Sequence, residues 1–133
     1  MYAIELKDVV KDYTHCGQPA VDGLNLRVGH GEIVTLLGPS GCGKTTTLRL
    51  IAGFERADTG TISLAGSVVS DGECFVTPDK RGIGMVFQDY ALFPHLTVAQ
   101  NVGFGCKPAE RTQRTQEMLE LVELPDMGDR YPH

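Results

Sequence analysis

Clustered positive charge, long apolar runs and paired cysteines are all missing from this sequence. The 12 Lys and Arg residues are outnumbered by 17 Asp and Glu residues, giving a net charge of −5, whereas non-specific nucleic-acid binding needs clustered cations. The apolar stretch around Ile33–Leu37 is far shorter than the roughly 20 residues that span a bilayer. The cysteines at positions 16, 42, 74 and 106 form no Cys-x-x-Cys pair, which favours neither a zinc site nor a disulfide framework. We therefore expect no nucleic-acid partner, and any membrane contact has to come through another protein.

The composition is that of an ordinary globular domain. Hydrophobic residues make up 41% and charged residues 22% of the 133 positions, which indicates neither disorder nor a fibrous repeat. A chain of this length buries roughly two-thirds of its unfolded surface, enough for one domain with a core. Charged residues within Met1–Val10 interrupt the apolar stretch that an export signal needs. Reduced thiols and a cytosolic location are therefore expected.

Alternating apolar residues predict antiparallel β structure in the first part of the chain. Tyr2, Ile4 and Leu6 alternate and are followed by Val9 and Val10, as in a half-buried strand with an irregularity near Val9. The run Leu24–Val28 alternates in the same way before a glycine-rich break. The region 1–31 is therefore predicted to be antiparallel.

Two later runs are apolar at nearly every position. Glu32–Leu37 and Ile83–Phe87 have the pattern of strands that are covered on both faces by helices. Thr61–Leu64 is predicted to be a further strand, and the polar segment Ser70–Arg81 an exposed loop. A parallel core is expected to contain the two apolar runs.

Three helices are predicted from periodicity and end signals. The first covers about 43–52 with Gly53 as its C-terminal cap. Thr97 and Gln100 have the spacing of a capping box, which begins a short helix near 98–104. The third runs from about Ala109 to Glu123. Its apolar and charged side chains are predicted on different faces: Met118, Leu121 and Val122 against Arg111, Arg114 and Glu117.

The motif with the clearest chemistry is Gly38-Pro-Ser-Gly-Cys-Gly-Lys-Thr45, which fits Gly-x₄-Gly-Lys-Ser/Thr. Its glycines let backbone amides turn inward around a phosphate, and the helix that follows favours negative charge at its N-terminus. Lys44 is expected to reach the β- and γ-phosphates of ATP, Thr45 to coordinate Mg²⁺ and Thr46 to contact the α-phosphate. The predicted nucleotide-binding residues here are Gly38, Pro39, Ser40, Gly41, Cys42, Gly43, Lys44, Thr45 and Thr46.

The motif alone leaves several classes open, because kinases, GTPases and motor ATPases share it. The wider sequence resembles the nucleotide-binding subunit of ATP-binding-cassette (ABC) transporters. The runs that carry the resemblance are Leu36–Gly53, Asp58–Ile62 and Gly84–Val102. The resemblance implies an α/β P-loop NTPase fold of the ABC ATPase type, present in part. Its expected parts are the antiparallel region 1–31, a P-loop core at 32–90 and the start of a helical subdomain at 91–133.

The same resemblance implies roles for residues outside the phosphate loop. Gln88 matches the glutamine that senses Mg²⁺ and the γ-phosphate, although a polar residue at a strand end is otherwise unremarkable. Tyr13 matches the aromatic residue that stacks on adenine, a contact that needs only a flat π-face; the alternative is a core tyrosine at a strand end. The region Gln88–His95 corresponds to the surface that receives a membrane-spanning permease.

The sequence also departs from the family pattern. It contains no Leu-Ser-Gly-Gly-Gln signature, no acidic strand end with an adjacent catalytic glutamate, and no switch histidine. We therefore predict no catalytic residue within these 133 positions and interpret the chain as a truncated fragment. ATP binding without efficient turnover is expected, because phosphoryl transfer depends on precise positioning and charge stabilisation.

The functional prediction is an ATP-binding, energy-coupling subunit of an importer, peripheral on the cytoplasmic side of the membrane. Its expected partners are a permease and, for the full-length ATPase, a second copy of itself. Ferric iron is the first cargo hypothesis, followed by sugars, polyamines and sulfate or molybdate. The alternatives are a P-loop kinase or GTPase acting on a soluble substrate, and a module that keeps the nucleotide site only for structure.

Overall fold

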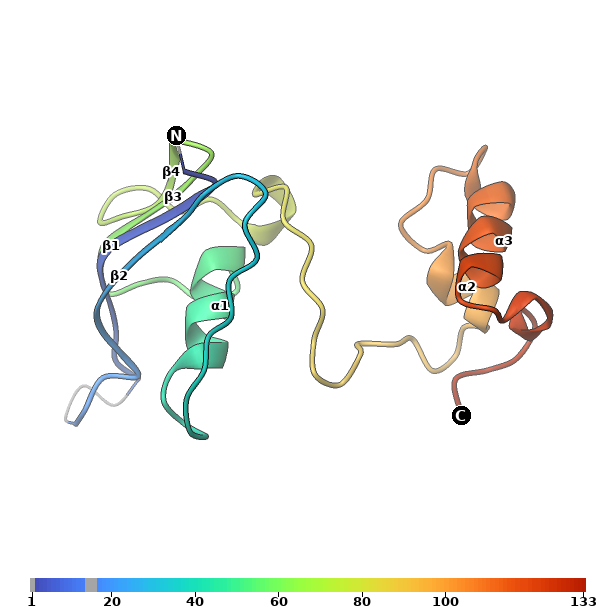
Figure 1. Cartoon of the computed structure of the whole chain (residues 1–133), viewed down its shortest axis with the longest axis horizontal. Helices are drawn as coiled ribbons and strands as arrows, with labels where there is room; N and C mark the ends of the chain where they lie inside the picture. The colour runs from blue at the N-terminus through green and yellow to red at the C-terminus, as the bar shows by residue number, and fades with distance from the viewer. Residues whose placement is uncertain (1, 14–16) are drawn as a thin grey trace. The chain divides into compact units, whose positions relative to one another are not determined.

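The computed structural model describes residues 2–13 and 17–133. The chain divides into two compact units, Met1–Met85 and Val86–His133. In the first unit, the described residues form one antiparallel sheet with the strand order β2-β1-β3-β4 (Figure 1). Its strands are β1 (Ile4–Lys11), β2 (Val21–Val28), β3 (Thr59–Leu64) and β4 (Ser67–Ser70). The predicted strands near the N-terminus and at Thr61–Leu64 are thus confirmed.

The core of the first unit lies between this sheet and helix α1 (Lys44–Ala52). Leu6, Val9 and Ile62 from the sheet are buried together with Leu50 and Ile51 from α1. Burying side chains of this size stabilises the fold by roughly 1.5–3 kcal/mol each. The helix that follows the glycine loop is therefore fixed to the sheet by its apolar face.

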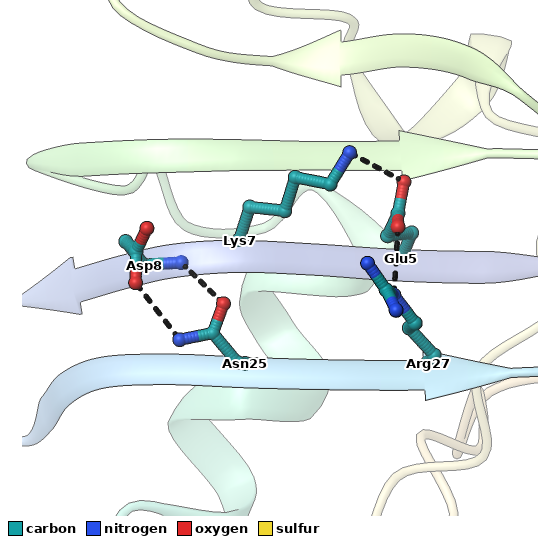
Figure 2. A network of polar contacts seen from close by, with 5 residues as sticks. All are labelled: Glu5, Lys7, Asp8, Asn25 and Arg27. Carbon is teal, nitrogen blue, oxygen red and sulfur yellow. Dashed lines mark hydrogen bonds and ion pairs between the residues drawn. The ribbon is translucent and has the colours of Figure 1, made fainter.

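Strand β1 contains the predicted irregularity. Its register to β2 shifts between Leu6 and Val9 and again before Lys11, and Asp8 has a positive φ of 48°. Asn25 holds this conformation, since its side-chain amide donates to Asp8 Oδ1 at 2.8 Å and its Oδ1 accepts from the Asp8 backbone amide at 3.1 Å (Figure 2). Asn and Asp tolerate the left-handed region better than most residues.

Glu5 forms a second polar cluster on the same strands. Its carboxylate pairs with Lys7 at 3.0 Å and with Arg27 at 2.9 Å (Figure 2). The hydrogen bond from Lys7, assisted by the one from Arg27, lowers the pKa of Glu5. The pair with Arg27 joins β1 to β2, whereas the pair with Lys7 lies within β1.

The two runs predicted as buried parallel strands, Glu32–Leu37 and Ile83–Phe87, are not strands in the structure. Ile33 and Leu37 are 97% and 95% exposed, and Val86 is 89% exposed. The reason is that a buried strand needs partners on both sides, and no strand among residues 2–13 and 17–133 pairs with either run. Their apolar pattern is real, but the sheet that the pattern anticipates is absent from the described part.

The prediction that Ser70–Arg81 is an exposed loop is wrong at both ends. Ser70 is buried at the end of β4, and Arg81 is only 7% exposed. Between them, Pro78–Lys80 forms one turn of 3-10 helix. The polar sequence led to a wrong prediction because backbone carbonyls accept the hydrogen bonds of the Arg81 guanidinium. This side chain can therefore be buried without an acidic partner.

Arg81 donates four hydrogen bonds that join α1 to the sheet. Its Nη1 reaches the carbonyls of Leu50 and Ile51 at 2.8 Å each, which lie in the last turn of α1. Nη2 and Nε donate to Val69 at 3.3 Å and Val76 at 2.7 Å. Burial lowers the pKa of Arg81. Carbonyls at a helix C-terminus have no partner within the helix, so a cation at this position satisfies them.

The second unit is helical, with α2 (Val98–Val102), α3 (Arg111–Leu121) and a 3-10 turn at Pro125–Met127. The capping box is confirmed, because Thr97 Oγ1 accepts from the Gln100 amide while Gln100 Oε1 accepts from the Thr97 amide. Helix α3 is also confirmed, but it buries Thr115 and Leu119. The predicted apolar face is wrong: Met118, Leu121 and Val122 are exposed.

The described parts of the chain, 2–13 and 17–133, include no helix that is both long enough and apolar enough to cross a membrane.

Replacing Arg81 with Met tests whether these four hydrogen bonds stabilise the first unit. The change leaves the buried carbonyls of Leu50 and Ile51 without donors, at a cost of about 1–3 kcal/mol for an unsatisfied buried group. We expect Arg81→Met to lower the free energy of unfolding by about 3 kcal/mol in urea denaturation. Arg56→Met is the matched control, because Arg56 also lies over the Phe75 ring, at 5.8 Å, but is exposed. Equal losses for the two variants would contradict the assigned role of Arg81.

Candidate functional site

The glycine loop 38–43 leads directly into α1, and Gly43 sets the junction. Gly43 has φ 90° and ψ 0°, in the left-handed region, at the N-cap of the helix. A Cβ placed on Gly43 would overlap the backbone carbonyl oxygen of Ala20. Both the conformation and the close approach therefore require glycine at this position. Gly41 has a similar φ of 82°, but open space surrounds the position that its Cβ would take.

The N-terminus of α1 offers backbone donors without a competing acid. The first amides of a helix have no acceptor within it, and the first turn of α1 contains no acidic residue. The helix dipole therefore leaves partial positive charge at the loop. Such an end is well suited to bind a phosphate.

Lys44 adds a full positive charge to the same place. Its Nζ donates to the carbonyl oxygens of Gly38, at 2.8 Å, and Pro39, and lies 3.4 Å from Cys42 Sγ. The lysine side chain therefore folds back along the loop and does not extend into solvent. An ammonium group beside a row of backbone amides is the donor set that a polyphosphate requires.

Thr47 supports the junction and was not anticipated as part of the site. It is buried, its amide donates to the Gly43 carbonyl at 2.8 Å and its hydroxyl donates to the same oxygen at 3.0 Å. Two donors thus hold the carbonyl of the glycine at the N-cap. A signal existed in the sequence, since Thr in a helix often bonds the carbonyl four residues earlier.

The side chains present fit Mg²⁺ only as a companion of a phosphate. Within residues 2–13 and 17–133, no group of three or more His, Cys, Asp or Glu side chains is arranged to hold a metal ion. Mg²⁺ often binds through few protein ligands, substrate phosphates and water. The exposed hydroxyl of Thr45 at the end of the loop fits this mode.

Cys42, Cys74 and Cys106 are free thiols in the structure, whereas Cys16 lies outside the described residues.

Of the two residues expected to act outside the loop, Tyr13 lies in the first unit and Gln88 in the second. Tyr13 is 51% exposed just beyond the end of β1, and Lys11 Nζ lies 5.4 Å from its ring centroid. Its exposed ring is not the core tyrosine of the alternative interpretation. Gln88 is exposed within a turn in which Tyr90 N donates to Phe87 O at 3.0 Å. The contact of Gln88 with metal and γ-phosphate stays a prediction.

The apolar segment after Gln88 is held in place but exposed. Asn101 in α2 donates to the Phe93 carbonyl at 3.1 Å and accepts from its amide at 2.9 Å, and the Phe93 ring lies 4.4 Å from that of Phe104. Leu92 and Phe93 nevertheless remain exposed. The surface expected to receive a permease therefore presents apolar side chains on a supported loop.

Comparison with known proteins assigns the class. The family model described as ABC transporter matches residues 21–133, which is most of the sequence. The chain therefore belongs to the ABC transporter family.

Two relatives and one solved structure show how much of such a protein is present. The spermidine/putrescine import ATP-binding protein PotA of Oleidesulfovibrio alaskensis is 49% identical over 110 residues, covering 83% of this chain and 28% of PotA. PotA of Chromobacterium violaceum is 49% identical over 141 residues, covering 100% of this chain and 37% of PotA. The dimeric, post-hydrolysis ATP-binding cassette MJ0796 bound to ADP and Pi superimposes with a TM-score of 0.80 at 29% identity. The matched region covers 97% of this chain and 61% of the MJ0796 chain. The chain thus spans roughly a third of the curated relatives and less than two-thirds of the solved cassette.

These findings confirm the fold expected from the sequence, an α/β ABC ATPase fold present in part. The phosphate loop and α1 lie within the residues that the family model matches.

A pair of glycine substitutions tests the geometry at the start of α1. Gly41→Ala and Gly43→Ala both place a Cβ at a positive φ, which costs about 1–2 kcal/mol. Only Gly43→Ala also creates an overlap with Ala20. We expect it to lower the thermal midpoint well beyond the shift of Gly41→Ala, as measured by circular dichroism. Matching shifts in the two variants would mean that the approach of Ala20 to Gly43 does not constrain the loop.

Proposed function

We propose that the chain is the front part of the ATP-binding subunit of an ABC importer and binds Mg-ATP at Gly38–Thr45. The observation that carries this proposal is the loop itself, where Gly43 opens α1 in a left-handed conformation and Lys44 lies along the loop carbonyls. A helix N-terminus with an adjacent ammonium favours a polyphosphate. Family membership supports ATP as the nucleotide.

Each residue has a proposed role in nucleotide binding. The backbone amides from Gly38 to Thr46, except at Pro39, which has no N–H, surround the phosphates. Lys44 neutralises the β- and γ-phosphates, and the Thr45 hydroxyl binds Mg²⁺. Tyr13 stacks on adenine, for which its exposed ring is suited. For Gln88, which lies in the second unit, contact with the metal and the γ-phosphate stays a prediction from the family resemblance. Mg²⁺, when bound, neutralises charge on the phosphates.

In this proposal, ATP hydrolysis is an activity of the whole protein. The signature, the acidic strand end, the catalytic glutamate and the switch histidine are not among the 133 residues. The relatives are longer, since the chain covers only 28% to 37% of the two PotA proteins above. We therefore propose that the 133-residue chain binds Mg-ATP and that turnover, coupled to transport, requires the remaining parts.

For the cargo, the comparisons favour a polyamine over the ferric iron expected from the sequence. Both relatives described above are named as spermidine/putrescine import ATP-binding proteins. Their names do not support ferric iron as the cargo. We propose polyamine import as the process that the full protein energises.

The proposed partners are a membrane permease and a second ATPase subunit. The apolar side chains of Leu92 and Phe93 are exposed, as a docking surface for a permease within Gln88–His95 requires. The similar cassette MJ0796 has been solved as a dimer. Attachment to a permease would hold the protein peripherally at the cytoplasmic face of the inner membrane.

Replacing Lys44 tests phosphate binding directly. Lys44→Ala removes a charge-assisted hydrogen bond to phosphate, which contributes about 1.5–3 kcal/mol. We expect the Kd for Mg-ATP, measured by isothermal titration calorimetry, to rise roughly 10- to 100-fold. Lys107→Ala is the control, since it removes the same charge from an exposed position of the second unit. Unchanged affinity in a folded Lys44→Ala variant would remove the phosphate loop from the binding site.

Competition between nucleotides separates this proposal from a GTPase. Guanine recognition normally needs base-specific polar contacts, whereas an aromatic ring such as Tyr13 recognises a base by stacking. We expect Mg-ATP to bind at least as tightly as Mg-GTP when each displaces a fluorescent ATP analogue. A strong preference for GTP would favour the GTPase alternative over an importer subunit.

A further inference from the structure

We propose that Asp58 is a positioning residue for the nucleobase, acting through Lys11 on the adenine-stacking ring of Tyr13. The inference rests on the proposed role of Tyr13. It deepens that role by naming the groups that hold the ring.

Asp58 binds the chain at three consecutive residues just before Tyr13. Its Oδ1 pairs with Lys11 Nζ at 3.1 Å, and its Oδ2 accepts from the Asp12 backbone amide at 2.7 Å. The Asp58 amide itself donates to the Val10 carbonyl at 2.9 Å. Asp58, immediately before β3, thus holds the end of β1 and the residue after it by its backbone amide and by both carboxylate oxygens.

We call these contacts of Asp58 with the end of β1 the Asp58 clamp. Lys11 connects the clamp to the aromatic ring of Tyr13. Its side chain is only 15% exposed, so the ion pair with Asp58 restricts the position of the ammonium. The same Nζ lies 5.4 Å from the Tyr13 ring centroid, within the range of a cation–π contact. An aromatic ring has two faces, so a base can stack on the face that Lys11 does not occupy.

The residue just before β2 contacts the phosphate loop. Ala20, immediately before β2, packs its carbonyl against Gly43 so closely that no Cβ fits between them. Asp58 thus holds the residues just before Tyr13, and Gly43 at the N-cap of α1 contacts the residue just before β2. Both contacts lie in the first unit.

A purely structural role of Asp58 and a positioning role predict different effects on the binding of ligands with and without a base. Inorganic tripolyphosphate has the phosphates of ATP but no base, so it reports on the phosphate loop alone. If Asp58 acts through Tyr13, its loss weakens Mg-ATP and leaves Mg-tripolyphosphate unaffected. If Asp58 only stabilises the fold, its loss affects both ligands to the same degree.

The experiment measures both ligands by isothermal titration calorimetry on the 133-residue chain and on Asp58→Ala, Tyr13→Ala and the double variant. Stacking of a base on an aromatic side chain predicts roughly tenfold weaker Mg-ATP binding for each single variant. The double variant should be no weaker than Tyr13→Ala, because both changes remove the same interaction. Mg-tripolyphosphate should stay within about twofold throughout.

Glu5→Ala is the matched control. It removes a carboxylate that pairs with Lys7 and Arg27 on the same sheet, and we expect both ligands to bind as before. Lys11→Met serves as a second test of the clamp if Asp58→Ala is not folded by circular dichroism, and it should also weaken Mg-ATP alone.

The outcomes separate this inference from the proposed function. The inference is overturned, and the proposed function stands, if Tyr13→Ala weakens Mg-ATP binding while Asp58→Ala and Lys11→Met leave it unchanged. The same conclusion follows if Asp58→Ala and Lys11→Met weaken the binding of Mg-ATP and of Mg-tripolyphosphate equally. If Tyr13→Ala has no effect while Lys44→Ala does, the stacking role and the inference both fall. If the unaltered chain is folded and binds neither ligand, the proposed function fails.

Discussion

The phosphate loop meets helix α1 at a junction constrained by the close approach of the Ala20 carbonyl to Gly43. Only a residue without a side chain can adopt the left-handed conformation at this junction and also touch that carbonyl. The contact places the start of α1 against Ala20, the residue just before β2. Thr47 then holds the Gly43 carbonyl with two hydrogen bonds. The start of α1, where we propose that phosphate binds, is therefore fixed by this packing contact and by Thr47.

The C-terminal end of helix α1 is also held by hydrogen bonds. Gly53 ends the helix in a left-handed conformation, with its amide 2.9 Å from the Arg49 carbonyl, and Arg81 binds the carbonyls of Leu50 and Ile51. The side chains of Leu50 and Ile51 on one face of the helix are buried against the sheet. A helix fixed at both ends and along one face keeps its N-terminal amides in one arrangement, and preorganised donors bind charge more effectively than mobile ones.

Features specified by neighbouring residues could be predicted from the sequence, and features specified by distant partners could not. The loop motif, the Gly53 cap and the Thr97 capping box are each encoded within a few positions, and the structure contains all three. The burial of Arg81 depends on carbonyls contributed by Leu50 and Val69, which no local pattern indicates. Glu32–Leu37 and Ile83–Phe87 have the apolar pattern of central strands, but strand formation depends on pairing partners. Asp58 lies 46 residues from Asp12 in sequence, so the clamp on β1 became apparent only in three dimensions.

The central claim, that main-chain donors between Gly41 and Thr46 bind the nucleotide's phosphates, is open to a direct spectroscopic measurement. A ¹⁵N-labelled sample titrated with Mg-ATP reports on every backbone amide, and at 14.4 kDa the chain is small enough for this. If phosphate binds at the start of α1, the largest amide shifts fall on Gly41–Thr46. This claim would be contradicted if these loop amides stayed unchanged while residues elsewhere in the chain shifted, or if a folded sample gave no shifts at all.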